Sequence, residues 1–341
     1  MDALSDVLRI VQLTGAVYLD AAFSAPWCIV VPADAPLCAA YLPPADRVVS
    51  FHLITEGRCW ASLPHDPSSA VELEAGEVVV VPMGETHLLG SSAGLSPVFL
   101  GPLLAEQVET KPGEVMTIAH GRGGSSTRMI CGFLASHDLW RNPLLSGLPR
   151  LFKVAMRGSS ASWVEESLRF ATEEAASAHA GGAAVLAKLA ELVFVHAVRR
   201  YVDTMPDGCK GWLAGLRDRG VARALALMHA HPAQAWTVEE LAGRIGMSRS
   251  GLAQRFTDLL GMPPMQYLAQ WRLQVAAQKL RLGRPLASVA EEIGYESEAA
   301  FNRAFKREFG MPPATWRKKM TRAATPDDGE GRAASRSAVS T

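Results

Sequence analysis

Apolar positions near the C-terminus follow the spacing of two short amphipathic helices. Within residues 286–310, four apolar residues recur at the i, i+3, i+4 and i+7 spacing of one helical face, and three phenylalanines follow at intervals of four. These residues are Leu286, Val289, Ala290 and Ile293, then Phe301, Phe305 and Phe309. Gly294 ends the first helix, because glycine tolerates the left-handed backbone past a C-cap, and Ser297 can cap the second. A short helix, a glycine-containing turn and a second helix with a polar, basic outer face predict a helix-turn-helix that enters a DNA major groove.

Residues 237–261 repeat this pattern. Thr237 and Glu240 form a capping box at the start of the first helix of this copy. Three positions match between the copies: Gly246 with Gly294, Phe256 with Phe305, and Gly261 with Gly310. The intervening residues 265–281 contain no Gly or Pro and predict one connecting helix of about 25 Å, at about 1.5 Å per residue. The sequence therefore predicts two recognition helices held at the ends of one rod, which can reach successive segments of the major groove.

The repeated units resemble the DNA-binding domain of the AraC/XylS family of bacterial transcription regulators. The family signature reads here as Ala290, Gly294-Tyr295, Phe301-Asn302-Arg303-Ala304-Phe305-Lys306, Gly310, Pro313 and Trp316-Arg317. Pro312 and Trp316 depart from it, since Ser or Thr and Tyr are usual at these positions. The resemblance implies a DNA-binding domain over residues 221–319, with helix-turn-helix units at 237–261 and 286–310. It places DNA contacts at Ser248, Arg249, Ser250, Ala253 and Gln254 in the first unit, and at Ser297, Glu298, Asn302, Arg303 and Lys306 in the second.

The two units are not equally equipped to read bases. Ser250 and Ala253 are small residues at base-reading positions of the first unit. Asn302 and Arg303 are expected to dominate discrimination, because Asn suits adenine and Arg suits guanine. Arg249 and Lys306 are expected to hold phosphates, so the first unit contributes more to positioning.

Residues 28–135 consist of short apolar runs separated by Pro and Gly, which predicts an all-β sandwich or barrel. Within them, residues 76–87 fit the spacing Gly-x5-Pro-x-Gly-x2-His, which ends at His87, and resemble the second signature of the cupin jelly roll. The earlier motif, which supplies two His and a Glu in metal-binding cupins, is missing, since Ser50 stands in place of the Glu. We therefore predict neither a metal nor another cofactor, because a divalent metal needs three or four converging ligands.

Without that ligand set, other roles are open to the cupin-like domain. A barrel of this size can hold one small effector, in a pocket lined partly by His52, Cys59, Trp60 and His87. Alternatively, side chains fill the interior and the domain serves only dimerisation. Redox sensing by Cys28 and Cys131 is a further alternative, although buried cysteines more often act as small apolar residues.

Charge and cysteine content support the division into two halves. Residues 1–220 carry 17 basic and 23 acidic residues, whereas residues 221–341 carry 17 basic and 11 acidic residues. An excess of basic residues fits a domain that binds DNA phosphates. The five cysteines form no Cys-x-x-Cys pair, which argues against a disulfide framework and against a structural zinc site.

The remaining segments predict location and connections. The N-terminus carries acidic residues where a secretory signal has a basic region, and the apolar stretch 185–198 is too short and too charged to span a bilayer, so we expect a cytoplasmic protein without a membrane partner. Residues 163–178 and 183–201 predict two helices that pack on the barrel or on a second subunit. The glycine-rich segment 206–220 predicts an interdomain linker, and residues 320–341 predict a disordered tail.

The expected fold is α+β with two domains. Residues 1–205 form a cupin-like β-barrel or jelly roll with accessory helices, and the C-terminal domain is all-α, with two helix-turn-helix units joined by a long helix. The expected function is a sequence-specific transcription factor that responds to a small effector or a redox signal. Its partners are double-stranded promoter DNA, a second copy of the chain, and RNA polymerase if it is an activator. The alternative is a cupin-type metal enzyme carrying a DNA-binding domain, for which no catalytic residue is predicted.

Overall fold

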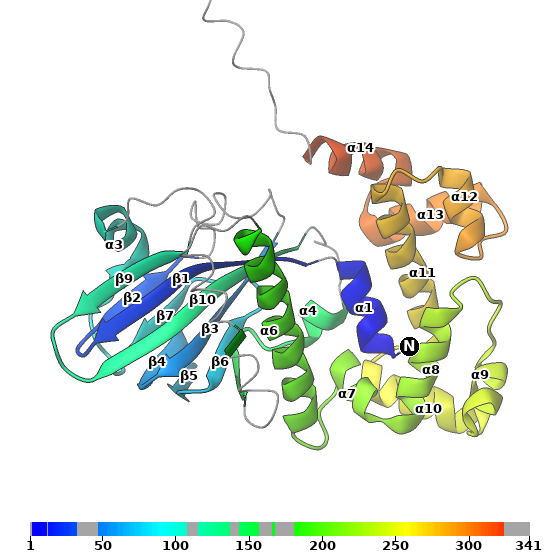
Figure 1. Ribbon diagram of the computed structural model, residues 1–341. Helices are drawn as coiled ribbons and strands as arrows, with labels where there is room; N and C mark the ends of the chain where they lie inside the picture. The colour runs from blue at the N-terminus through cyan, green and yellow to red at the C-terminus, as the bar shows by residue number, and fades with distance from the viewer. Residues whose placement is uncertain are drawn as a thin grey trace, which may run out of the picture.

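The computed structural model describes residues 2–11, 13–32, 47–107, 115–136, 143–156, 166–167 and 181–323. The N-terminal part contains two β-sheets with accessory helices, and the C-terminal part is helical (Figure 1). This arrangement confirms the expected α+β fold with two domains.

The β-strands form two sheets of jelly-roll character. One sheet has the order β11 (Phe152–Ala155), β6 (Glu77–Val81), β3 (Arg47–Glu56), β10 (Ser126–Ser136), β1 (Thr14–Ser24) and β9 (Met116–Gly121). The other has the order β5 (Asp66–Glu74), β4 (Arg58–Leu63), β7 (His87–Gly90), β2 (Cys28–Val31) and β8 (Val98–Phe99). Neighbouring strands are antiparallel except for β1 with β9 and β2 with β8.

The larger sheet is buried on both faces, and strand alternation divides its residues between two cores. On β3, Phe51 and Leu53 belong to the core under the covering helices, whereas Ile54 belongs to the inner core between the sheets. His52 shares the inner face with Ile54 because it lies two residues before it on the strand. The interior predicted for the cupin-like domain is therefore the space between the two sheets.

Helix α6 (Gly182–Thr204) covers the outer face of the larger sheet (Figure 1). It approaches β1 closely at Gly15, where an added Cβ would lie 2.4 Å from the carbonyl oxygen of Ala187 and 2.7 Å from the Cβ of Ala190. Only a residue without a side chain fits between this strand and this helix. Three shorter helices complete the domain: α1 (Ala3–Val11), α3 (Leu100–Gln107) and α4 (Pro143–Gly147).

The C-terminal domain consists of eight helices within the described residues. They are α7 (Trp212–Arg217), α8 (Arg219–Ala230), α9 (Val238–Ile245), α10 (Arg249–Leu260), α11 (Pro264–Arg281), α12 (Leu286–Glu292), α13 (Glu298–Phe309) and α14 (Pro313–Ala323). Helices α9 and α10 form the first helix-turn-helix, α12 and α13 form the second, and α11 connects them.

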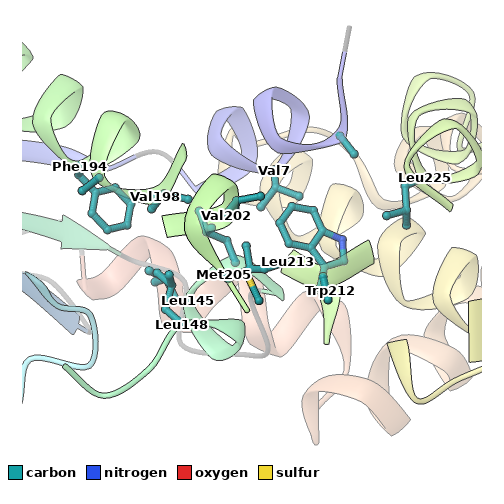
Figure 2. Packing of buried hydrophobic residues seen from close by; sticks show 14 of the residues in the cluster. Val7, Leu145, Leu148, Phe194, Val198, Val202, Met205, Trp212, Leu213 and Leu225 are labelled. Carbon is teal, nitrogen blue, oxygen red and sulfur yellow. The ribbon is translucent and has the colours of Figure 1, made fainter. Parts of the chain in front are cut away.

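The two domains share a continuous apolar core. Helices α1, α4 and α6 of the N-terminal domain pack against α7, α8 and α11 of the C-terminal domain. Figure 2 shows Val7, Val202, Met205, Trp212 and Leu213 gathered at this junction. All five are buried, so the domains meet through a packed interface.

This packing involves the segment expected as a linker. Residues 206–220 contain α7 and the start of α8, and Trp212 in their midst is only 6% exposed. Helix α14 extends to Ala323, so residues 320–323 are helical although a disordered tail was expected there. Residues 324–341 and all but two positions of the expected helix at 163–178 lie outside the described residues.

Candidate nucleic-acid interface

Side-chain caps set where the two recognition helices begin. The Ser248 hydroxyl oxygen accepts the Gly251 N–H at 3.1 Å ahead of α10, and the Ser297 hydroxyl oxygen accepts the Ala300 N–H at 3.2 Å ahead of α13. Both serines are exposed. Two of the predicted DNA-contacting residues therefore also define the helix N-termini, where backbone N–H groups favour phosphate.

Helix α13 has one buried aromatic face and one exposed polar face. Phe301, Phe305 and Phe309 are at most 2% exposed. The ring centroid of Phe305 lies 4.3 Å from that of Phe309 and 5.8 Å from that of Trp316, which lies on α14. This packing fixes the rotation of α13 about its own axis. The opposite face carries the predicted contact residues Glu298, Asn302, Arg303 and Lys306.

The polar face of α13 keeps its hydrogen-bonding groups available. Glu298, Arg303 and Lys306 are exposed, and Asn302 is half-buried. Among the described residues, none of these four side chains takes part in a hydrogen bond or an ion pair. Their donors and acceptors are therefore free to meet base edges or phosphates.

Helix α10 presents fewer uncommitted groups. Arg249, Ser250 and Gln254 are exposed, and Ala253 is half-buried. The Gln254 side-chain amide donates to a carboxylate oxygen of Asp258, one turn further on, at 2.8 Å. The longest base-reading side chain of this helix is thus already engaged, whereas Arg303 on α13 is not.

Helix α11 holds the two units at a defined separation. Its 18 residues span about 27 Å at about 1.5 Å each, and α10 and α13 lie toward opposite ends of it (Figure 1). Arg272 on α11 donates to the backbone carbonyls of Pro232 at 2.6 Å and Gln234 at 2.8 Å, ahead of α9. These bonds fix the rod to the first unit.

At its other end, α11 is tied to the second unit by an ion-pair cluster. Glu292 of α12 accepts hydrogen bonds from Lys279, from Arg284 at 2.7 Å and from Ser288 at 2.7 Å. These bonds, with that from Lys279 the largest cause, lower the pKa of the Glu292 carboxyl to about 2. The carboxylate therefore stays charged throughout the physiological range.

A buried network that the sequence pattern did not reveal joins α7, α8 and α11. The Trp212 indole N–H donates to the Tyr267 oxygen at 2.8 Å, and the same oxygen lies 2.7 Å from Nε2 of His229. The His229 ring stacks on Trp271 with centroids 3.6 Å apart. Burial lowers the pKa of His229 to about 3, so its imidazole is neutral and accepts the Tyr267 O–H.

The predicted histidines of the effector pocket meet between the two sheets. His52 and His87 are fully buried, and their Nε2 atoms are 2.7 Å apart. Nδ1 of His87 lies 2.9 Å from the Glu85 carbonyl oxygen, to which it donates, so the hydrogen between the two Nε2 atoms belongs to His52. Burial lowers the pKa of both, that of His87 to about 4. The pair is neutral and internally hydrogen-bonded.

The other predicted sensing residues divide between faces. Cys59 and Cys131 belong to the inner core, whereas Trp60 is half-buried on the opposite face of β4, and Cys28 lies on β2 facing away from that core. Alternation along each strand therefore separates Trp60 from the histidines and Cys28 from Cys131. Burial raises the pKa of Cys59 to about 12 and that of Cys131 well above its usual value.

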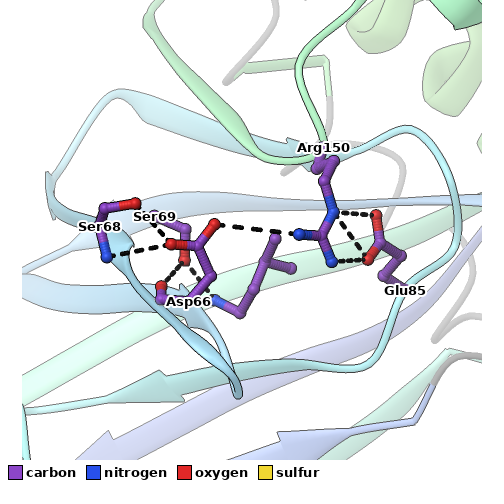
Figure 3. A network of polar contacts seen from close by, with 6 residues as sticks. Asp66, Ser68, Ser69, Glu85 and Arg150 are labelled. Atoms are coloured by element: carbon purple, nitrogen blue, oxygen red, sulfur yellow. Dashed lines mark hydrogen bonds and ion pairs between the residues drawn. The ribbon is translucent and has the colours of Figure 1, made fainter.

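An ion-pair network on the surface orients the turn before His87. Nε of Arg150 donates to both carboxylate oxygens of Glu85, at 2.9 and 3.0 Å, and Nη1 of Arg150 lies 3.9 Å from Asp66 (Figure 3). Hydrogen bonding from Arg150 lowers the pKa of the Glu85 carboxyl. Because the Glu85 carbonyl accepts from His87, this network also restrains the buried histidine pair.

Comparison with known proteins identifies the family. Residues 2–203 match the family described as Cupin, and residues 241–319 match the family described as Helix-turn-helix domain. A putative AraC-like transcription regulator of Streptomyces lividans is 32% identical over 322 residues, which cover 94% of this chain and 99% of that protein. The chain belongs to the AraC family of transcription regulators.

Two further relatives of this AraC-type regulator match along nearly their whole length. They are the HTH-type transcriptional regulator AlkR of Acinetobacter baylyi and the RCS-specific HTH-type transcriptional activator RclR of Escherichia coli. Each is 28% identical over 323 residues, covering 94% of this chain and 100% and 98% of those proteins, respectively. Within the described ranges of the regulator, no three His, Cys, Asp or Glu side chains gather as a metal site. No described helix is long and apolar enough to cross a membrane.

Proposed function

We propose that this AraC-type regulator binds double-stranded promoter DNA through two recognition helices of unequal weight. Helix α13 supplies most of the sequence discrimination, with Asn302 on adenine and Arg303 on guanine, and α10 mainly positions the domain. One observation carries this proposal. Arg303 is exposed without a partner among the described residues, whereas the amide of Gln254 on α10 is bound to Asp258.

The other predicted residues surround these readers. Arg249 and Lys306 are exposed cations that suit phosphate contacts, and the capped N-termini at Ser248 and Ser297 add backbone N–H donors. Glu298, in the first turn of α13, is placed to accept from a cytosine amino group. The short side chains on α10 fit contacts that hold register more than contacts that specify sequence.

Replacing Arg303 by Ala tests the assignment directly. The change should cost about 1–3 kcal/mol at the cognate site, or roughly 5- to 150-fold in Kd, and leave binding to unrelated sequence nearly unchanged. Cognate duplexes are first selected from a random pool by the wild-type protein, and Kd is then measured by fluorescence anisotropy. Lys306→Ala is the control, since loss of a phosphate contact weakens all sequences alike.

Two outcomes would contradict this division of labour. Equal weakening of Arg303→Ala on cognate and scrambled duplexes would reassign Arg303 to phosphate contact. Greater sequence information in the half-site of α10 than in that of α13 would reverse the proposed weights.

We infer that the cupin-like domain senses a small effector. His52, His87 and Cys59 line its interior, and the neutral histidine pair offers polar contacts that a ligand could exchange. Redox sensing by Cys28 and Cys131 has weaker support, because the thiolate is the reactive form and burial raises the pKa of both thiols. Unchanged DNA affinity after oxidant treatment would remove it.

We further propose that the regulator acts without catalysis, in the cytoplasm, as a homodimer. One of its relatives is named a transcriptional activator, which supports activation through contact with RNA polymerase. Light scattering coupled to size-exclusion chromatography tests the dimer, and in vitro transcription with purified polymerase tests activation.

A further inference from the structure

A groove opens where helices of the two domains meet outside the β-sandwich. It is lined by α1 and α6 of the N-terminal domain and by α7 and α8 of the C-terminal domain, and its volume is about 420 Å³. Figure 1 shows these four helices around the junction. Pockets for small molecules have volumes of about 300–1,000 Å³, so the groove is large enough for one.

The groove has an apolar floor. Leu4 of α1 and Leu216 of α7 are half-buried there, beside Val202 of α6, which is 9% exposed. Ala222 and Ala226 of α8 complete the floor, and their short side chains leave space above it. An apolar molecule in the groove would remove the remaining surface of these side chains from water.

Two arginines from different domains stand over this floor. Arg199 of α6 and Arg223 of α8 are exposed, and neither takes part in a hydrogen bond or an ion pair with any described residue. Two carboxylates also line the groove. That of Asp2 accepts two hydrogen bonds from Ser5, at 2.9 and 2.8 Å, and that of Asp203 is exposed and uncommitted. Two free guanidinium groups therefore face one free carboxylate, which favours an anion.

We propose that this groove binds a small organic anion with an apolar body and that its occupancy regulates DNA binding. The anionic group pairs with Arg199 and Arg223, whose planar forks of N–H donors match carboxylate or sulfonate oxygens. The apolar body covers Leu4, Val202 and Leu216. The regulatory part rests on the proposed function as a DNA-binding regulator, whereas the binding site itself does not.

Control of DNA binding follows from the origin of the lining residues. A molecule that pairs with an arginine of each domain binds best to one arrangement of the domains, and it shifts the population toward that arrangement. If DNA prefers the same or another arrangement, the anion changes DNA affinity, and DNA changes anion affinity by the same factor. Couplings of this kind are typically about 5- to 150-fold.

The probe for the site is 1-anilinonaphthalene-8-sulfonate, a fluorescent organic anion with an aromatic body. The full-length protein should bind it with a stoichiometry near one. The double variant Arg199→Ala/Arg223→Ala should bind it roughly tenfold more weakly or worse, because two charge-assisted contacts are lost. Arg219→Ala is the matched control, since Arg219 is an exposed arginine of α8 that does not line this groove, and it should bind as wild type does.

A second variant tests the groove without removing charge. Ala226→Leu fills the space above the floor and should abolish probe binding, while far-UV circular dichroism and Tm show that the protein is folded. Wild-type probe affinity in both the arginine double variant and Ala226→Leu overturns the site. So does equal weakening by Arg219→Ala, which would indicate a general effect of positive charge.

DNA binding is measured separately, with and without saturating probe. A change in Kd for selected DNA in the wild type, absent in Ala226→Leu, supports regulation through the groove. An unchanged Kd with the probe bound overturns the regulatory part. If the protein selects no DNA sequence at all, the proposed function fails, and the probe titrations still decide whether the groove binds anions.

Discussion

The second helix-turn-helix is expected to unfold on its own when Phe305 is replaced by Ala. Phe305 is fully buried in a cluster formed by α11 to α14, which is separate from the large core shared by the two domains. Removing a buried phenylalanine costs about 3–5 kcal/mol. Residues 273–323, which contain this cluster, number about 50, and at about 0.05–0.15 kcal/mol per residue their stability is roughly 3–8 kcal/mol.

The loss is therefore comparable with the whole stability of this unit. A large fraction of the variant molecules should have α12 to α14 unfolded at 25 °C, with lower ellipticity at 222 nm and early proteolytic cleavage in this region. The sandwich should unfold at its wild-type temperature. DNA affinity should fall mainly for selected sequences, because α13 supplies the discrimination.

Phe256 provides the matched control, since it occupies the equivalent position in the first unit and is also fully buried. It belongs to the core that continues through the junction into the N-terminal domain. Phe256→Ala should lower the main unfolding transition without producing a separate one. A single transition, shifted equally in both variants, would show that the two cores behave as one cooperative unit and would refute the reasoning.

Further predictions concern the close helix-strand contact and the buried histidines. Gly15→Val should lower the free energy of unfolding by about 1–3 kcal/mol in urea titrations, because α6 must move away from β1, whereas Gly243→Ala, with no atom within 4 Å of the new Cβ, should raise it by about 0.5–1 kcal/mol. Equal effects would exclude a steric cause. His52 and His87 have folded pKa values below the ordinary 6.5, that of His87 at about 4, so the unfolded chain binds more protons between these limits and stability should fall as pH drops from 6.5 toward 4. The double variant His52→Gln/His87→Gln should show a shallower fall, the remainder coming from groups such as His229, and an unchanged slope would mean that the pair does not titrate as described.

The C-terminal helices were predictable because their determinants are local. Thr237 and Ser297 accept the hydrogen bonds expected of caps, and Gly246 and Gly310 adopt the left-handed backbone expected after a helix. Each signal involves residues within a few positions of one another. Helix ends and buried faces therefore follow from spacing alone.

The sandwich was predictable only in part. Its strands and the inward position of His87 agree with the apolar runs and the Pro-Gly corner. Assigning Cys59 and Trp60 to one pocket was wrong for Trp60, because adjacent strand residues point to opposite faces. That error was avoidable from the two-residue period, whereas the contact between His52 and His87 depends on how distant strands are placed and leaves no local signal.

The junction had no counterpart in the sequence pattern. The glycines of residues 206–220 suggested a flexible tether, yet Trp212 packs in the shared core and donates to Tyr267, which lies 55 positions away. The glycines are compatible with either outcome, since they permit tight turns as readily as disorder. What decides between them is the partner surface supplied by α1, α8 and α11, which only the folded chain brings together.

This packed junction limits how a signal can reach the DNA. A flexible tether would let the recognition helices move independently of the sandwich, and occupancy of the N-terminal domain would then change only their local concentration. Here Val7, Val202 and Trp212 belong to one core, so a displacement of α1 or α6 must either repack that core or move α7 and α8 with it. Close-packed interfaces switch between discrete arrangements and resist gradual deformation. A ligand that spans α6 and α8 acts at the boundary where these arrangements differ, and can therefore alter DNA affinity without contacting α10 or α13.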